Sequence, residues 1–81
     1  MAYQKILSLT DLKELAETEE GIEVFLDYEF LYRTDLRVQY QDGLWNIYYG
    51  DDDPSEGLSD LQLEKETSII KGLEDSKLYK Y

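Results

Sequence analysis

The sequence predicts an α+β domain in which an N-terminal helix is followed by a three-stranded antiparallel meander. One or two C-terminal helices then pack on one face of the sheet. Three observations support this fold class: a capped apolar stripe after Ser8, an alternating segment at 22–30, and Asp42-Gly43 between two strand-like segments. With 81 residues, the chain makes a single small domain, 1–81, in which burial and ordering entropy nearly cancel.

The first element is a helix expected over 9–19. The Ser8 hydroxyl can accept from the backbone amide of Asp11, whose carboxylate also suits the positive end of a helix. An apolar stripe then recurs at helical spacing, formed by Leu9, Leu12, Leu15 and Ala16. Gly21 is expected to end the helix in a left-handed conformation.

Residues 22–30 change to the period of two that is typical of a strand. One face carries Ile22, Val24, Leu26, Tyr28 and Phe30, and the other carries Glu23, Phe25, Asp27 and Glu29. We expect the apolar face to point to the core and the carboxylate-rich face to point outward. Residues 31–35 are expected to form a connection.

The next two strands are predicted to form a hairpin around Asp42-Gly43, a sequence typical of type I′ turns. This turn places Tyr40 opposite Trp45, Val38 opposite Ile47 and Leu36 opposite Tyr49, on one apolar face. The alternate pairs are polar, namely Gln39 with Asn46 and Arg37 with Tyr48. A slip of one residue would mix the two faces, so the turn and the pattern agree on one register.

The rest of the chain begins with a loop at 50–57, rich in glycine, proline and acidic residues. Ser59 and Gln62 fit a capping box, so a helix is expected near Asp60. Thr67-Ser68 resembles a second cap, for a short helix that Gly72 weakens by roughly 1 kcal/mol. The tail at 78–81 fits either a short strand or a docked extended end. The expected core comprises Leu9, Leu12, Leu15, Ile22, Val24, Leu26, Val38, Tyr40, Trp45, Ile47 and residues from among Ile69, Ile70 and Leu73.

The composition excludes several classes of function. The chain has no histidine and no cysteine, which removes the commonest general base, the commonest transition-metal ligand and every thiolate site. The N-terminus lacks the apolar segment of a signal peptide, and no apolar run approaches 18 residues. We therefore expect a soluble, cytoplasmic protein without a cofactor.

The net charge of −11 is concentrated in two blocks. Residues 11–29 hold eight acids against one lysine, a sum of −7, and residues 51–66 hold seven acids against one lysine, a sum of −6. Between them, residues 30–50 are neutral and rich in aromatic side chains. We therefore expect the two acidic blocks to form a surface that a basic partner could bind.

Asp51, Asp52 and Asp53 invite a calcium interpretation, since hard cations prefer several oxygen ligands. An EF-hand loop that starts at Asp51 would place Glu56 where glycine is needed and Gln62 where a bidentate glutamate is needed. A solvated acidic loop fits better, and a cation-binding domain remains a minor alternative.

Catalysis by paired carboxylates is the next alternative. Asp27 and Glu29 share a strand face at a separation of about 7 Å, but that face is expected to be exposed, without the apolar pocket that raises an acid's pKa. No nucleophile elbow, phosphate-binding glycine loop or histidine relay is present. The sequence therefore predicts a protein that is not an enzyme.

Direct binding of nucleic acid is disfavoured, because only eight basic residues occur and they form no patch. The reverse is more informative: carboxylates at helical and strand spacings can present rows of negative charge that resemble a phosphate backbone. A protein with a basic nucleic-acid groove would attract such a domain, more strongly at low salt. The alternative is an acidic surface that serves solubility alone.

Tyrosine is also abundant, with eight in the chain. Tyr48 is predicted on the outer hairpin face beside Arg37, and Tyr32, Tyr79 and Tyr81 lie near connections or the terminus. Exposed tyrosine beside arginine is typical of interface hot spots, while cover for a sheet edge explains any single one equally well.

In size, charge and layout, and in the segments Glu66-Thr67-Ser68-Ile69-Ile70 and Leu78-Tyr79-Lys80-Tyr81, the chain resembles the small acidic open reading frames of phage and prophage accessory regions. Some proteins of that kind inhibit host nucleic-acid enzymes or defence systems, by imitating DNA or by blocking a basic groove. The resemblance implies a similar role, although it transfers no catalytic or binding residue.

The leading hypothesis is an interaction domain, and not an enzyme, that binds a basic host surface as an inhibitor or DNA mimic. The runner-up is a structural or assembly module that associates through its aromatic sheet face, with a homodimer left open. No direct contact with nucleic acid or membrane is expected. The predicted contact set is Asp11, Glu14, Glu17, Asp27, Glu29, Tyr48, Asp51, Asp52 and Asp53.

Overall fold

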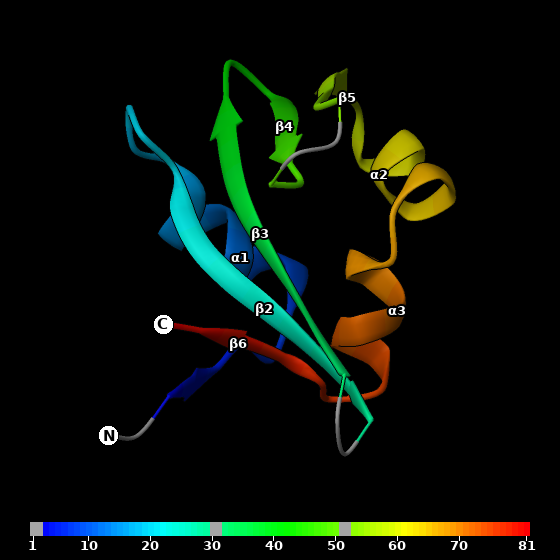
Figure 1. Cartoon of the computed structure of the whole chain (residues 1–81). Helices are drawn as coiled ribbons and strands as arrows, with labels where there is room; N and C mark the ends of the chain where they lie inside the picture. The colour runs from blue at the N-terminus through cyan, green and yellow to red at the C-terminus, as the bar shows by residue number, and fades with distance from the viewer. Residues whose placement is uncertain (1–2, 30–31, 51–52) are drawn as a thin grey trace.

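The computed structural model describes residues 3–29, 32–50 and 53–81. Figure 1 shows the chain as one twisted sheet with helices beside it. The elements are β1 (Gln4–Lys5), α1 (Leu9–Ala16), β2 (Ile22–Glu29), β3 (Tyr32–Gln41), β4 (Leu44–Tyr48), β5 (Ser55–Leu58), α2 (Asp60–Glu66), α3 (Ile69–Glu74) and β6 (Leu78–Lys80).

Among the described residues, the sheet has six antiparallel strands in the order β1-β6-β2-β3-β4-β5. The predicted fold class, a three-stranded meander with helices packed on it, is therefore wrong, and strands hold more of the chain than helices do. The predicted meander corresponds to β2, β3 and β4, and the three additional strands extend it on both sides. These strands are two to four residues long. A periodic pattern does not show in so few residues. The backbone groups of β1 and β6 also rely on partners distant in sequence.

The β2–β3 ribbon is longer than expected. Residues 32–35 belong to β3, where Asp35 pairs with Phe25 and Arg33 with Asp27, so the predicted connection at 31–35 is wrong from Tyr32 onward. The charged side chains of Arg33 and Asp35 interrupt the apolar pattern, so the sequence does not indicate a strand here. The strand forms nevertheless, because pairing with β2 satisfies its backbone groups. Phe30 and Leu31 lie outside the described residues.

The β3–β4 hairpin confirms the turn prediction. Asp42 and Gly43 have φ angles of 55° and 78°, as a type I′ turn requires. Tyr40 pairs with Trp45, and Val38 pairs with Ile47. The polar pairs, Gln39 with Asn46 and Arg37 with Tyr48, also form as predicted. β4 ends at Tyr48, one residue short of the predicted pair between Leu36 and Tyr49.

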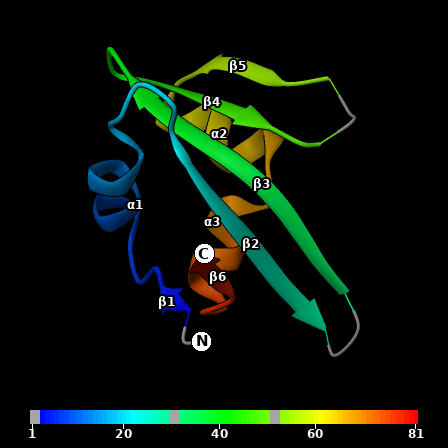
Figure 2. The ribbon, with the colours of Figure 1, turned by 60° about the vertical axis from the view of Figure 1, so that its left-hand side comes forward.

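Residues 50–57 are not a simple loop, because Ser55–Leu58 forms β5 along β4 (Figure 2). The Asn46 side chain stabilises this edge, since its Oδ1 accepts from the backbone amide of Gly57 at 2.9 Å. The tail is the strand β6, which pairs with both β1 and β2. The first and last strands of the chain, β1 and β6, therefore lie side by side in the sheet (Figure 1).

The cap at Ser8 is confirmed: its side chain accepts from the amide of Asp11. The helix is shorter than predicted and ends at Ala16, because the chain turns where the amide of Thr18 donates to the Ala16 carbonyl. Gly21 does not end the helix but lies in the turn directly before β2, where its amide donates to the Thr18 carbonyl. Its φ is 73°, and a Cβ atom there would lie 2.5 Å from the Val38 carbonyl oxygen. Only glycine suits both constraints.

The predicted capping box at α2 is confirmed, since Ser59 and Gln62 exchange both hydrogen bonds. α3 also forms where expected, although Ser68 makes no side-chain cap bond. Instead, Thr67 Oγ1 accepts from the amide of Ile69.

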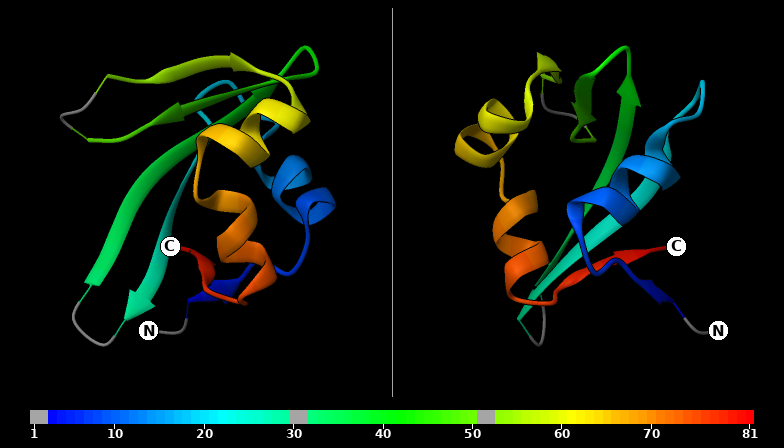
Figure 3. Two further views of the ribbon diagram at one scale, coloured as in Figure 1. Left: turned by 90° about the vertical axis from the view of Figure 1, so that its right-hand side faces the viewer. Right: turned by 180° about the vertical axis from the view of Figure 1, so that it is seen from behind.

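The three helices share one side of the sheet. α1 lies behind β2 and β3 in Figure 1 and in front of them in the rear view of Figure 3, where α2 and α3 stand beside it. The core between the helices and the sheet is one cluster of buried residues: Ile6, Leu12, Ala16, Val24, Leu26, Leu36, Val38, Trp45, Ile47, Leu58, Leu63, Ile69 and Leu78. The remaining predicted core residues pack against this cluster half-buried, namely Leu9, Leu15, Ile22, Tyr40, Ile70 and Leu73. The opposite side of the sheet, the outer face, carries no described helix.

Candidate functional site

The structure divides the predicted acidic contact set between two sides of the molecule. Asp11 and Glu14 are exposed on α1, and Glu17 is exposed directly after it. Asp27 is exposed on the opposite side, because it shares the outer face of β2 with Phe25. These residues do not form one surface.

The remaining predicted acids follow β2 and β4. Glu29 is the last residue of β2, and its side chain lies outside the described part. Asp51 and Asp52 also lie outside the described residues, whereas Asp53 is exposed before β5.

The acids of α1 are not neutralised. In the described part of the chain, Asp11, Glu14 and Glu17 have no ion-pair partner. Lys13, the basic residue of α1, is engaged elsewhere, since its Nζ lies 2.9 Å from Asp60 Oδ2. The exposed side of α1 therefore presents free carboxylates.

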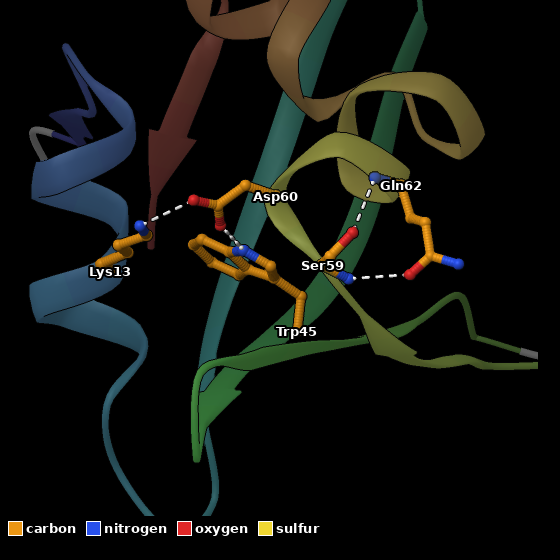
Figure 4. Close-up of polar contacts among 5 residues, drawn as sticks. All are labelled: Lys13, Trp45, Ser59, Asp60 and Gln62. Carbon is orange, nitrogen blue, oxygen red and sulfur yellow. Dashed lines mark hydrogen bonds and ion pairs between the residues drawn. The ribbon is translucent and has the colours of Figure 1, made fainter.

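The ion pair between Lys13 and Asp60 belongs to a three-residue bridge (Figure 4). Asp60 Oδ1 accepts from Trp45 Nε1 at 2.8 Å, while its other oxygen binds Lys13. The bond from Trp45, and then that from Lys13, holds the pKa of the Asp60 carboxyl below its ordinary range. The same carboxylate raises the pKa of Lys13. The bridge joins α1, α2 and β4 and satisfies the polar atom of a fully buried indole.

The outer face carries an aromatic cluster around Phe25, formed with Tyr3, Tyr79 and Tyr81. The ring centroids lie 4.9 to 5.2 Å from that of Phe25. The Arg33 guanidinium covers the Phe25 ring, with its central carbon 4.4 Å from the centroid. Phe25 is buried although it faces away from the core, so the prediction that this face of β2 is only a carboxylate-rich surface was incomplete.

Tyr81 and Arg33 are tied into this face by polar contacts. The Tyr81 hydroxyl donates to Asp35 and accepts from Arg33. Partial desolvation and the hydrogen bond to Asp35 raise the pKa of Tyr81. The pKa of Arg33 is also raised, mainly by its hydrogen bond with the Tyr3 hydroxyl. The cluster attaches both terminal strands to β2 and β3.

Tyr48 lies opposite Arg37, as predicted, in a shallow groove of about 400 Å³ on the outer face. Arg37 is not free for a partner, because Nη2 lies 2.9 Å from Glu23 Oε1 and Nη1 donates to the Glu20 carbonyl. Asp35 is likewise paired with Arg33. Charge is largely balanced in this groove.

A second groove, of about 480 Å³, lies between the helices, and the sequence does not reveal it. We call it the helix groove. It is lined by Leu9, Asp60, Leu61, Glu64, Ile70, Leu73 and Glu74. Its lining residues come from three helices that are separate in the sequence. The sequence feature that could have indicated the groove is Leu61, an apolar residue of the poorly patterned α2 that is 59% exposed.

The described residues contain no group of three or more acidic side chains arranged to hold a metal ion. They also include no helix that is long and apolar enough to cross a membrane. Of the predicted acidic triplet, two members lie outside the described part. The structural features with chemistry to offer a partner are therefore three surfaces: the acidic side of α1, the outer face and the helix groove.

Searches against protein-family models, curated proteins and solved structures find no match to this chain.

Proposed function

We propose that this chain is a protein-interaction domain of phage or prophage type that binds a basic surface on a host protein in the cytoplasm. A nucleic-acid-binding groove is the class of surface that best suits carboxylates spaced along a helix, since its natural ligand is a polyanion. The domain acts there as an inhibitor or DNA mimic and has no catalytic step of its own.

The free carboxylates of α1 carry this proposal. Asp11, Glu14 and Glu17 are exposed without an ion-pair partner in the described chain, and Lys13 is held by Asp60. A cationic partner would not have to break an ion pair to reach these groups and would be drawn to them from a distance. Asp27 faces the other way, so one flat partner surface cannot use it together with α1.

The experiment compares which proteins of a bacterial lysate are captured by wild type, by a test variant and by a control variant, each at low and at raised salt. The test variant combines D11N, E14Q and E17Q, and its matched control combines E20Q, D42N and E56Q. Each variant removes three exposed carboxylates and so moves the net charge from −11 to −8. We expect the test variant alone to lose a salt-sensitive partner. Equal retention by the two variants, or partners that persist at high salt, would contradict the proposal.

The outer face supports a second candidate function, an assembly module, and for this candidate we propose self-association through the aromatic sheet face. Tyr3 and Tyr81 remain 46% and 42% exposed at the edge of the aromatic cluster, on a sheet side without a described helix. Exposed tyrosines with arginine are typical of interfaces. Light scattering after size exclusion separates the candidates: a dimer that survives high salt favours assembly, and a monomer favours the acidic interaction domain.

A further inference from the structure

The helix groove has an apolar floor. Leu9, Ile70 and Leu73 pack against the core and leave part of each side chain open to the groove. Leu61 lies at its edge and is 59% exposed, one of the most exposed large apolar side chains in the described chain. Apolar surface in a concave site gains free energy when a partner removes it from water.

The rim of the groove is acidic. Asp60, Glu64 and Glu74 line it, and no lysine or arginine is among its lining residues. Asp60 is already bound by Lys13 and Trp45, whereas Glu64 and Glu74 have no ion-pair partner within the described residues. Charge complementarity therefore selects a cationic occupant and disfavours nucleic acid or an anionic lipid surface.

The walls of the groove limit the occupant's backbone. They are formed by α1, α2 and α3 (Figure 3), and no residue of a described strand lines the groove. An extended peptide would find no strand to pair with and would bury unsatisfied polar groups. A helix satisfies its own backbone and can insert a row of apolar side chains.

We propose that the helix groove binds an amphipathic basic helix of the partner protein. Apolar side chains at helical spacing contact Leu9, Leu61 and Leu73, while flanking lysines or arginines pair with Glu64 and Glu74. This inference rests on the proposed function and adds the partner's chemistry: a basic surface presented on a helix with an apolar stripe.

The test uses a fluorescently labelled helical peptide of about 14 residues, roughly four turns, with leucines at i, i+4, i+7 and i+11 and lysines at exposed positions. A scrambled peptide of the same composition is its control. Fluorescence anisotropy gives the affinity of each peptide for the full chain. We expect the patterned peptide to bind about tenfold more tightly than the scrambled one.

Protein variants locate the binding. L61A, and separately E64Q combined with E74Q, should each weaken binding of the patterned peptide about tenfold. Their matched controls are L44A, at a leucine 42% exposed on β4, and E20Q combined with E56Q; both should leave the affinity unchanged. Emission from the single tryptophan, which is buried, checks that each variant folds.

Two outcomes overturn the inference. If both peptides bind equally, with salt sensitivity and no loss in L61A, the groove proposal fails while the charge-driven function stands. If neither peptide binds at low salt, the groove proposal also fails, and the lysate comparison of the α1 variants decides the proposed function separately. Preference for the patterned peptide that L61A abolishes supports the groove.

Discussion

At the residue scale, Asp60 connects a buried indole to a surface ion pair. Its folded pKa is lowered, so its contribution to stability is complete above the ordinary pKa of aspartate and is lost as pH falls through the lowered value. In D60N the amide oxygen can still accept from Trp45, but the attraction to Lys13 is removed. Because the Asp60 side chain is half exposed, we expect a loss of about 1 kcal/mol or less near pH 7.

Urea unfolding followed by Trp45 emission measures this difference at several pH values. The gap in free energy of unfolding between wild type and D60N should start to narrow as pH falls below the ordinary aspartate pKa, where the unfolded chain takes up the proton. It should close below the lowered folded pKa, where Asp60 is neutral in the folded state as well, like asparagine. A gap of constant size across that range would contradict an electrostatic role for Asp60.

Gly72 in α3 illustrates a residue whose effect cannot be judged from propensity. Alanine should favour an isolated helix by roughly 1 kcal/mol. A Cβ atom at this position would, however, lie 2.1 Å from Cδ2 of Leu26, which is itself buried. Overpacking of this kind costs about 1–3 kcal/mol, so we expect G72A to lower the free energy of unfolding in a urea titration.

A double-mutant cycle tests whether this contact is the cause. L26A removes the Cδ2 atom, so G72A should cost little or nothing when it is added to L26A. An equal penalty in both backgrounds would show that the contact with Leu26 is not responsible.

At the scale of elements, the C-terminal strand should behave as part of the centre of the sheet. The amide of Asp27 donates to the Lys77 carbonyl and that of Ile6 donates to the Leu78 carbonyl, each at 2.9 Å. We expect these amides to exchange hydrogen as slowly as those of β2 and β3. The amide of Gly21, in a surface turn, should exchange much faster and serves as the control. Rapid exchange at Ile6 and Asp27 would indicate that β6 frays.

The elements that the sequence predicts well are those whose signals are local. Ser8, Asp42-Gly43 and the capping box at Ser59 each define a turn or helix start within four residues, and all three form. β1, β5 and β6 are too short to carry a periodic signal. β1 and β6 pair with strands far away in the sequence, and β5 pairs with the preceding strand, β4. The three-stranded prediction failed for this reason.

The candidate site follows the same division. The exposure of Asp11 and Glu14 could be read from helical spacing, since they lie off the apolar stripe of α1. The burial of Phe25 could not, because it depends on Tyr3 and Tyr81 arriving from opposite ends of the chain. The helix groove likewise depends on how α1 packs beside α2 and α3, which no local pattern specifies.

For the whole molecule, a net charge of −11 on 81 residues has two consequences, a repulsion within the chain and an attraction toward basic partners. Within the folded chain, most carboxylates repel one another, and ion pairs such as those of Lys13 with Asp60 and Arg37 with Glu23 offset part of this repulsion. Toward a basic partner, the same carboxylates attract. The Debye length shortens from about 30 Å at 0.01 M salt to about 3 Å at 1 M, so the repulsion and the attraction weaken together.

We therefore expect added sodium chloride to raise the free energy of unfolding while it weakens binding of a basic partner. Urea titrations at low and high salt measure the first effect, and a constant m-value would show that the unfolded state has not changed. The variant with D11N, E14Q and E17Q should gain less stability from salt than wild type, because it has less repulsion to screen. Stability that falls with salt would mean that ion pairs such as Glu23 with Arg37 outweigh the repulsion among the remaining carboxylates.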